Sequence, residues 1–114
     1  MAITQRQDGE VTILDLDGVL MADRGVPEFR ETIRTLLEQG RTQILLNYDL
    51  LYMDDAGLDE ILKAHATVTK HGGMIKLSGL TRPNRFPGLA GFNLLAVLEV
   101  HEDELKALAS FRGN

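Results

Sequence analysis

Cysteine and tryptophan are both missing from this 114-residue sequence, and each absence narrows what the protein can do. Without cysteine there are no disulfides and no thiolate chemistry, and zinc ligands reduce to histidine and carboxylates. The three histidines, at positions 65, 71 and 101, show no metal-ligand spacing. Because tryptophan is absent and only two tyrosines and four phenylalanines are present, the chain also lacks an aromatic platform for base stacking. We expect no metal and no other cofactor.

Basic clusters and long apolar runs are absent as well. Twelve Lys and Arg residues are scattered singly against seventeen Asp and Glu, which gives a net charge of −5. Nucleic acid is therefore not an expected partner, because its binding rests largely on phosphate neutralisation. No apolar run approaches the roughly 20 residues that span a bilayer, and residues 1–6 contain no apolar signal core. We expect a cytoplasmic protein with no membrane insertion.

Turn signals and apolar periodicity predict strands that alternate with helices. We expect strands at 3–7, 11–17, 43–47, 74–78 and 94–100, and helices at 26–39, from about Asp54 to His71, and at 102–111. Asp8-Gly9 favours an opening hairpin, and Gly18 is expected to end the second strand. Prolines and glycines in 81–91 permit only a short or irregular helix there. The pattern predicts a single α/β domain, 1–114, with a mixed, mostly parallel sheet of about five strands packed against about four helices.

The stretch 51–62 is the best-marked part of the chain and reads as a short loop that opens a helix. The apolar residues of this segment and the residues that follow recur at the spacing of one buried helical face: Leu58, Ile61, Leu62 and Val68. His65 falls on the same face. Asp54 or Asp55 is suited to cap this helix, because a carboxylate accepts hydrogen bonds from first-turn N–H groups. Gly72 provides the residue that ends it. The loop follows the carboxyl end of a strand, where function tends to gather in such sheets.

Three side chains beside this loop allow two interpretations. Tyr48, Tyr52 and Met53 are able to form an exposed binding rim or to pack as core residues beneath the loop, and we favour the core. His65 is interpreted as a packed core imidazole rather than as a catalytic base. No Ser-His-Asp triad or glycine-rich phosphate loop is present in the sequence.

An enzymatic interpretation rests on Asp15 and Asp17. The run Leu14-Asp15-Leu16-Asp17-Gly18 resembles the first motif of haloacid-dehalogenase-type phosphatases, in which the first Asp is a nucleophile and Mg²⁺ neutralises charge. The order of the remaining motifs does not fit, because the acidic pair at 54–55 precedes Lys76 and Ser78. We favour the alternative in which Asp15 and Asp17 are solvent-side residues of a half-exposed strand.

The stretch from Leu45 to Leu58 is similar to the signature of the STAS domain, the fold of bacterial anti-sigma factor antagonists. That signature has an apolar strand ending in Asn or Asp, followed by Asp-Ser-Ser-Gly-Leu or Asp-Thr-Ala-Gly-Leu at a helix start. Here it reads Leu45-Leu46-Asn47 and then Asp54-Asp55-Ala56-Gly57-Leu58. Weaker similarities extend over nearly the whole chain, at 16–20, 72–74 and 91–100.

The resemblance implies a non-catalytic regulatory module that binds an anti-sigma factor, itself a serine kinase-like ATPase. The implied partner-binding residues are Asp54, Asp55, Ala56, Gly57 and Leu58. In the family the kinase phosphorylates the Ser or Thr after the motif Asp, and this position is Asp55 here. Because aspartate cannot accept a phosphoryl group from a serine kinase, the sequence predicts a phosphomimic-like, non-phosphorylatable switch.

Two other functions stay open. Asp-Asp-Ala-Gly is closer to the Asp-Thr-Ala-Gly version of the motif, which resembles STAS subunits that dock on the ATPase of a lipid-transport ABC complex. The less favoured alternative is the Mg²⁺-dependent phosphatase that uses Asp15 and Asp17. Homodimer formation is left open in each case.

Overall fold

A five-stranded mixed sheet forms the centre of the protein, seen in a computed structural model that describes residues 1–80, 94 and 96–112. The strand order is β1-β2-β3-β4-β5, and the bounds are β1 Ala2–Asp8, β2 Val11–Leu20, β3 Gln43–Met53, β4 Met74–Ser78 and β5 Glu99–His101. β1 and β2 form an antiparallel hairpin, whereas the other neighbours pair in parallel. The predicted mixed, mostly parallel sheet is confirmed.

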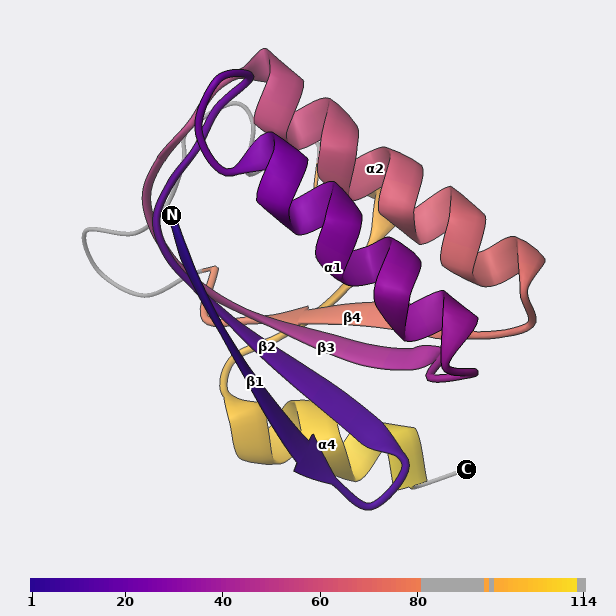
Figure 1. The fold of residues 1–114 in the computed structure, drawn as a ribbon. Coiled ribbons are helices and arrows are strands. Elements are labelled where there is room, and N and C mark those ends of the chain that lie inside the picture. Colours follow the sequence, from indigo (N-terminus) through magenta and orange to yellow (C-terminus); the bar gives the residue numbers. More distant parts are fainter. Residues whose placement is uncertain (81–93, 95, 113–114) are drawn as a thin grey trace.

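Three continuous helices cover the two faces of the sheet in the part of the chain that is described. α1 (Val26–Glu38) and α2 (Asp55–Lys70) lie side by side on one face, and α4 (Glu104–Arg112) covers the other (Figure 1). None of these helices has the length and apolar character needed to cross a bilayer. The helices predicted at 26–39 and 102–111 are confirmed within two residues at each end.

Alternation along the strands builds one core on each face of the sheet. In β2, Leu14 and Leu16 point into the larger core beneath α1 and α2, while Val11 and Ile13 pack with α4 in a smaller one. This period of two is the geometric signature of a strand whose two faces are both covered. The α1 residues that complete the larger core recur at helical spacing: Val26, Phe29, Ile33 and Leu36.

Two strands extend further than the sequence predicts. Gly18 does not end β2, because its positive φ of 101° lets the chain continue to Leu20. β3 runs to Met53 instead of stopping at Asn47, so residues 51–53 belong to a strand and not to a loop. Both extensions bring strand residues directly to the start of α2.

The last strand, predicted at 94–100, is confirmed only from Glu99 onward and is wrong before it. Leu94, Ala96 and Val97 are helical, and the Leu98 amide donates to the Leu94 carbonyl at 2.8 Å. Only Glu99–His101 pairs with β4, in parallel. The irregular segment predicted at 81–91 lies outside the described residues.

Tyr48 is fully buried under the helices, and its hydroxyl has no hydrogen-bond partner among the residues that the structure describes. Burial raises the pKa of this phenol to about 12. The unfolded phenol ionises near pH 10, so the folded state is at full stability below pH 10 and loses stability as the pH rises toward 12. The loss is on the order of 3 kcal/mol, because the unfolded chain releases a proton that the folded chain retains.

We expect Tyr48→Phe to raise the free energy of unfolding by about 1 kcal/mol at neutral pH, because it removes a buried hydroxyl that pairs with no described residue. The variant should also lose the alkaline decline that belongs to Tyr48. Urea unfolding of both proteins at pH 7, 10 and 11.5 measures the two effects. Parallel stability curves for the two proteins over this range would contradict the assignment.

Candidate functional site

The junction between β3 and α2 is fixed by the carboxylate of Asp54. Asp54 has an extended backbone and is the N-cap of α2, and its Oδ1 accepts from the Gly57 amide at 2.8 Å. Its Oδ2 accepts from the amide of Ala22, which follows β2, at 3.3 Å. The Asp54 amide in turn donates to the Leu20 carbonyl at 3.3 Å. One residue therefore ties the start of α2 to the end of β2.

Asp55 is the first residue of α2 and its side chain is exposed. Of the two predicted cap residues, Asp54 is the cap, and Asp55 faces solvent. No ion pair to Asp55 is found among the described residues. A negative charge at this position is favourable within the monomer, because the first-turn N–H groups give the helix a partial positive charge. Asp55 is therefore exposed at the N-terminus of α2 and does not contribute to the packing of this helix.

Gly57 is required by close approach rather than by a left-handed backbone. A Cβ at this position would lie 2.2 Å from the Leu20 carbonyl oxygen and 2.9 Å from Met53 Cγ. The absence of a side chain lets the first turn of α2 rest on the end of β2. Leu58 is buried next to it, at 9% exposure. Of the predicted partner-binding residues, Gly57 and Leu58 are thus buried, whereas Asp54 and Ala56 are half-buried.

We expect Gly57→Ala to lower the free energy of unfolding by about 2–4 kcal/mol, because either the helix or the end of β2 must move. Gly9→Ala is the matched control. Its Cβ would meet nothing within 4 Å, although its φ is +59°, so the cost should stay near the roughly 1 kcal/mol of left-handed strain. Chemical denaturation of both variants makes the comparison. Equal costs would show that close approach to Leu20 is not what selects glycine.

Leu51 and Tyr52 are the two residues before Met53, and both are exposed, at 67% and 54%. The expectation that Tyr48 and Met53 are core residues is confirmed, since both are buried. The same expectation for Tyr52 is wrong. Sequence alternation alone could not reveal this, because the change depends on a register shift between β2 and β3. The site therefore has an apolar part that the sequence does not predict.

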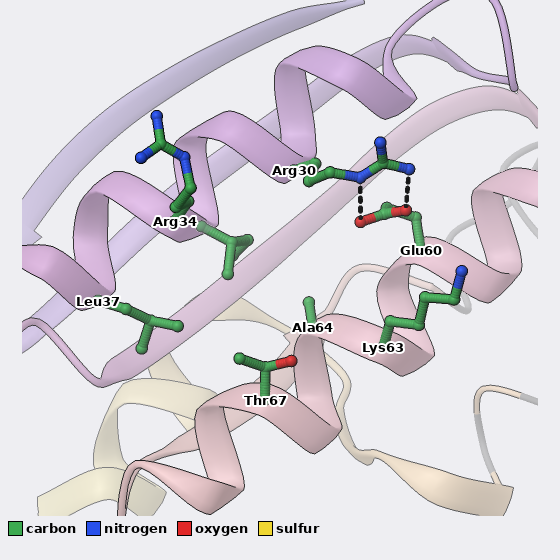
Figure 2. Close-up of a pocket in the computed structure, with 8 residues that line it drawn as sticks. Arg30, Arg34, Leu37, Glu60, Lys63, Ala64 and Thr67 are labelled. Atoms are coloured by element: carbon green, nitrogen blue, oxygen red, sulfur yellow. Dashed lines mark hydrogen bonds and ion pairs between the residues drawn. The ribbon is translucent and has the colours of Figure 1, made fainter.

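Glu60 links α2 to α1 and was not predicted to do so. It is buried, at 6% exposure, and its carboxylate makes two hydrogen bonds with the Arg30 guanidinium of α1, at 2.9 and 3.2 Å (Figure 2). The hydrogen bonds and the charge of Glu60 raise the pKa of Arg30. This pair closes one end of a groove between α1 and α2, whose lining includes Leu37, Ala64 and Thr67. It ties the first half of α2 to α1.

Asp15 and Asp17 are on the face of the sheet that carries α4. Asp15 accepts from the Arg6 guanidinium at 2.7 and 2.8 Å and from the Asn47 amide at 2.9 Å, whereas Asp17 is exposed. Arg6 also pairs with Glu104 of α4, and the two carboxylates raise its pKa. In the described residues no group of three or more His, Asp or Glu side chains could hold a metal ion.

Lys76 and His101 both pair with Glu99, whereas His65 and His71 have separate surroundings. The Lys76 ammonium is bonded to Ser110 and Glu99 and lies over the Phe111 ring. His71 caps the end of α2 through the Thr67 carbonyl. His65 is half-buried, and within the described part of the chain its Nδ1 has no hydrogen-bond partner.

Comparison with known proteins finds similar structures but no matching sequence family. No family model and no curated protein sequence matches the chain. Among solved structures, the anti-sigma factor antagonist SpoIIAA in its unphosphorylated form matches 99% of this chain and 100% of its own, with a TM-score of 0.77 and 21% identity. A candidate anti-sigma factor antagonist from Thermotoga maritima matches 96% of this chain and 94% of its own, with a TM-score of 0.81 and 20% identity.

Two further matches extend the comparison. The phosphorylated form of Bacillus SpoIIAA covers 96% of this chain and 99% of its own, with a TM-score of 0.71 and 23% identity. The murine anion transporter Slc26a9 matches 96% of this chain over 19% of its own, with a TM-score of 0.68 and 16% identity. The chain therefore has the fold of STAS-type anti-sigma factor antagonists over nearly its full length, which confirms the resemblance at the level of the fold.

Proposed function

We propose that this chain is a non-catalytic, cytoplasmic protein-binding module that resembles an anti-sigma factor antagonist held in its phosphorylated state, with Asp55 at the phospho-acceptor position. The proposal is supported by the SpoIIAA-like fold and by one local observation: the exposed Asp55 side chain on the first turn of α2. The partner is an anti-sigma factor of the serine-kinase type, which approaches the β3–α2 junction.

The chemistry of Asp55 makes the switch permanent. An ionised carboxylate carries one negative charge, against roughly 1.5–2 for a phosphoserine at neutral pH. It accepts hydrogen bonds but has no hydroxyl to receive a phosphoryl group. The charge is stabilised by the helix N-terminus when the protein is free. A kinase site that accommodates an unphosphorylated serine would meet this charge as repulsion, so the wild-type protein binds such a partner weakly.

We expect Asp55→Ser to gain phosphorylation when it is incubated with ATP and the anti-sigma kinase of the same organism. The same variant should bind the kinase about 10-fold more tightly in the absence of ATP, because one unfavourable charge is removed. Wild-type protein should remain unmodified. Intact-protein mass spectrometry and calorimetry are the measurements.

Two control variants separate charge from hydroxyl and position. Asp55→Asn is neutral but cannot be phosphorylated, so it should bind more tightly and still stay unmodified. Asp59→Asn removes an exposed acid one turn further along α2 and should change neither result. If Asp55→Ser shows no phosphorylation and no change in affinity, the proposed switch is wrong.

Two assays on the purified protein distinguish the two alternative functions. Binding to the ATPase of a lipid-transport ABC complex, with no binding to the anti-sigma kinase, would identify a scaffold subunit in its place. Mg²⁺-dependent hydrolysis of p-nitrophenyl phosphate that Asp15→Asn abolishes would identify a phosphatase. The Arg6 and Asn47 bonds to Asp15 argue against a free nucleophile there.

A further inference from the structure

The register shift between β2 and β3 exposes two consecutive apolar residues. Gly18 pairs with Leu50, but the next pair is Val19 with Tyr52, so Leu51 is an extra residue on β3. Leu50 and Met53 both point into the core beneath α1 and α2, which leaves the two residues between them on the opposite side of the sheet. Regular alternation would have buried Tyr52. Bulges are uncommon in parallel pairs and often re-aim a side chain next to a functional site.

Val19, Leu51 and Tyr52 together form what we call the bulge patch. Val19 is half-buried on β2, and its register partner Tyr52 is beside it on β3. Leu51 and Tyr52 are among the five most exposed large apolar side chains in the described chain, and they are adjacent. The patch directly precedes Asp54 and Asp55 in the chain. In the sequence it is therefore adjacent to the site proposed above.

One exposed carboxylate, that of Asp17, lies near the bulge patch. Asp17 precedes Val19 by two residues on the same face of β2. It forms no ion pair with another described residue. A second copy of the chain would bring this carboxylate against its own copy, which disfavours a symmetric contact. Complementarity points to a partner with the opposite charge.

We propose that the bulge patch is the hydrophobic anchor of the partner interface, and that its occupant is a partner protein whose apolar hollow is ringed by Lys and Arg. Tyr52 and Leu51 enter the hollow, while Asp17 pairs with a cation at its rim. This inference rests on the proposed function and extends it. The bulge patch at the end of the sheet provides most of the binding energy for the partner, and Asp55 at the start of α2 controls whether binding takes place. Aromatic anchors beside a charged rim are the usual source of binding energy in protein interfaces.

The experiment measures binding of the anti-sigma kinase of the same organism to four variants, each built on Asp55→Ser so that binding is strong. Tyr52→Ser and Leu51→Ser should each weaken binding by about 30-fold or more. Leu105→Ser is the matched control, since Leu105 is 79% exposed on α4, and it should change affinity by less than twofold. Asp17→Lys should weaken binding and reduce its dependence on salt.

Tyrosine fluorescence provides a direct readout of the anchor. The chain has two tyrosines and no tryptophan, so Tyr48→Phe leaves Tyr52 as its single emitter. In the free protein acrylamide should quench this emission readily, because Tyr52 is 54% exposed. The emission of the kinase's own tyrosines and tryptophans is measured separately and subtracted. In the complex, acrylamide should quench the remaining Tyr52 emission less than in the free protein.

Each outcome decides the inference. Kinase binding that survives Leu51→Ser and Tyr52→Ser within twofold overturns the anchor and leaves the proposed function intact. Absence of kinase binding by wild type and by Asp55→Ser overturns both. Self-association of the chain that Tyr52→Ser abolishes, with kinase binding unchanged, identifies a second copy as the occupant and also overturns it.

Discussion

The two hydrogen bonds accepted by the Asp54 carboxylate determine where α2 begins and what it displays. One bond satisfies the Gly57 amide within the first turn, and the other reaches back to Ala22 beyond the end of β2. A cap that bonds only within its own helix fixes the helix start; a cap that also bonds a neighbouring strand fixes its position relative to the sheet. Asp55, the next residue, is consequently held at a defined place on the surface.

The surroundings of this cap are arranged to let α2 approach the sheet closely. Gly57 removes the one side chain that would collide with the Leu20 carbonyl, and the Arg30–Glu60 pair holds the helix from the side of α1. The extra residue Leu51 adjusts the end of β3 so that Met53 enters the core next to Gly57. The consequence of that adjustment is an exposed Tyr52. Packing of the helix start and exposure of the bulge patch are thus two results of one local geometry.

Local signals in the sequence were sufficient for most of the elements, and they narrowed the cap to Asp54 or Asp55. Either carboxylate has an amide donor three residues later, so only the structure identifies Asp54 as the cap. The limits came from tertiary contacts. The apolar run at 94–98 is compatible with a buried strand or a buried helix, and periodicity over five residues cannot separate them. Tyr52 was placed in the core because a bulge cannot be recognised before strand register is known. Arg6 and Glu104 meet across 98 positions of sequence, beyond the reach of any local pattern.

The most direct test of this account is amide hydrogen exchange in wild type and Asp54→Ala. In wild type, the Gly57 and Ala22 amides should both exchange slowly, because the same carboxylate protects them. In Asp54→Ala both should exchange at least about 10-fold faster, while the amides in the middle of α2 remain protected. Acceleration at Gly57 alone, or at neither residue, would contradict the claim that Asp54 joins the start of α2 to the end of β2.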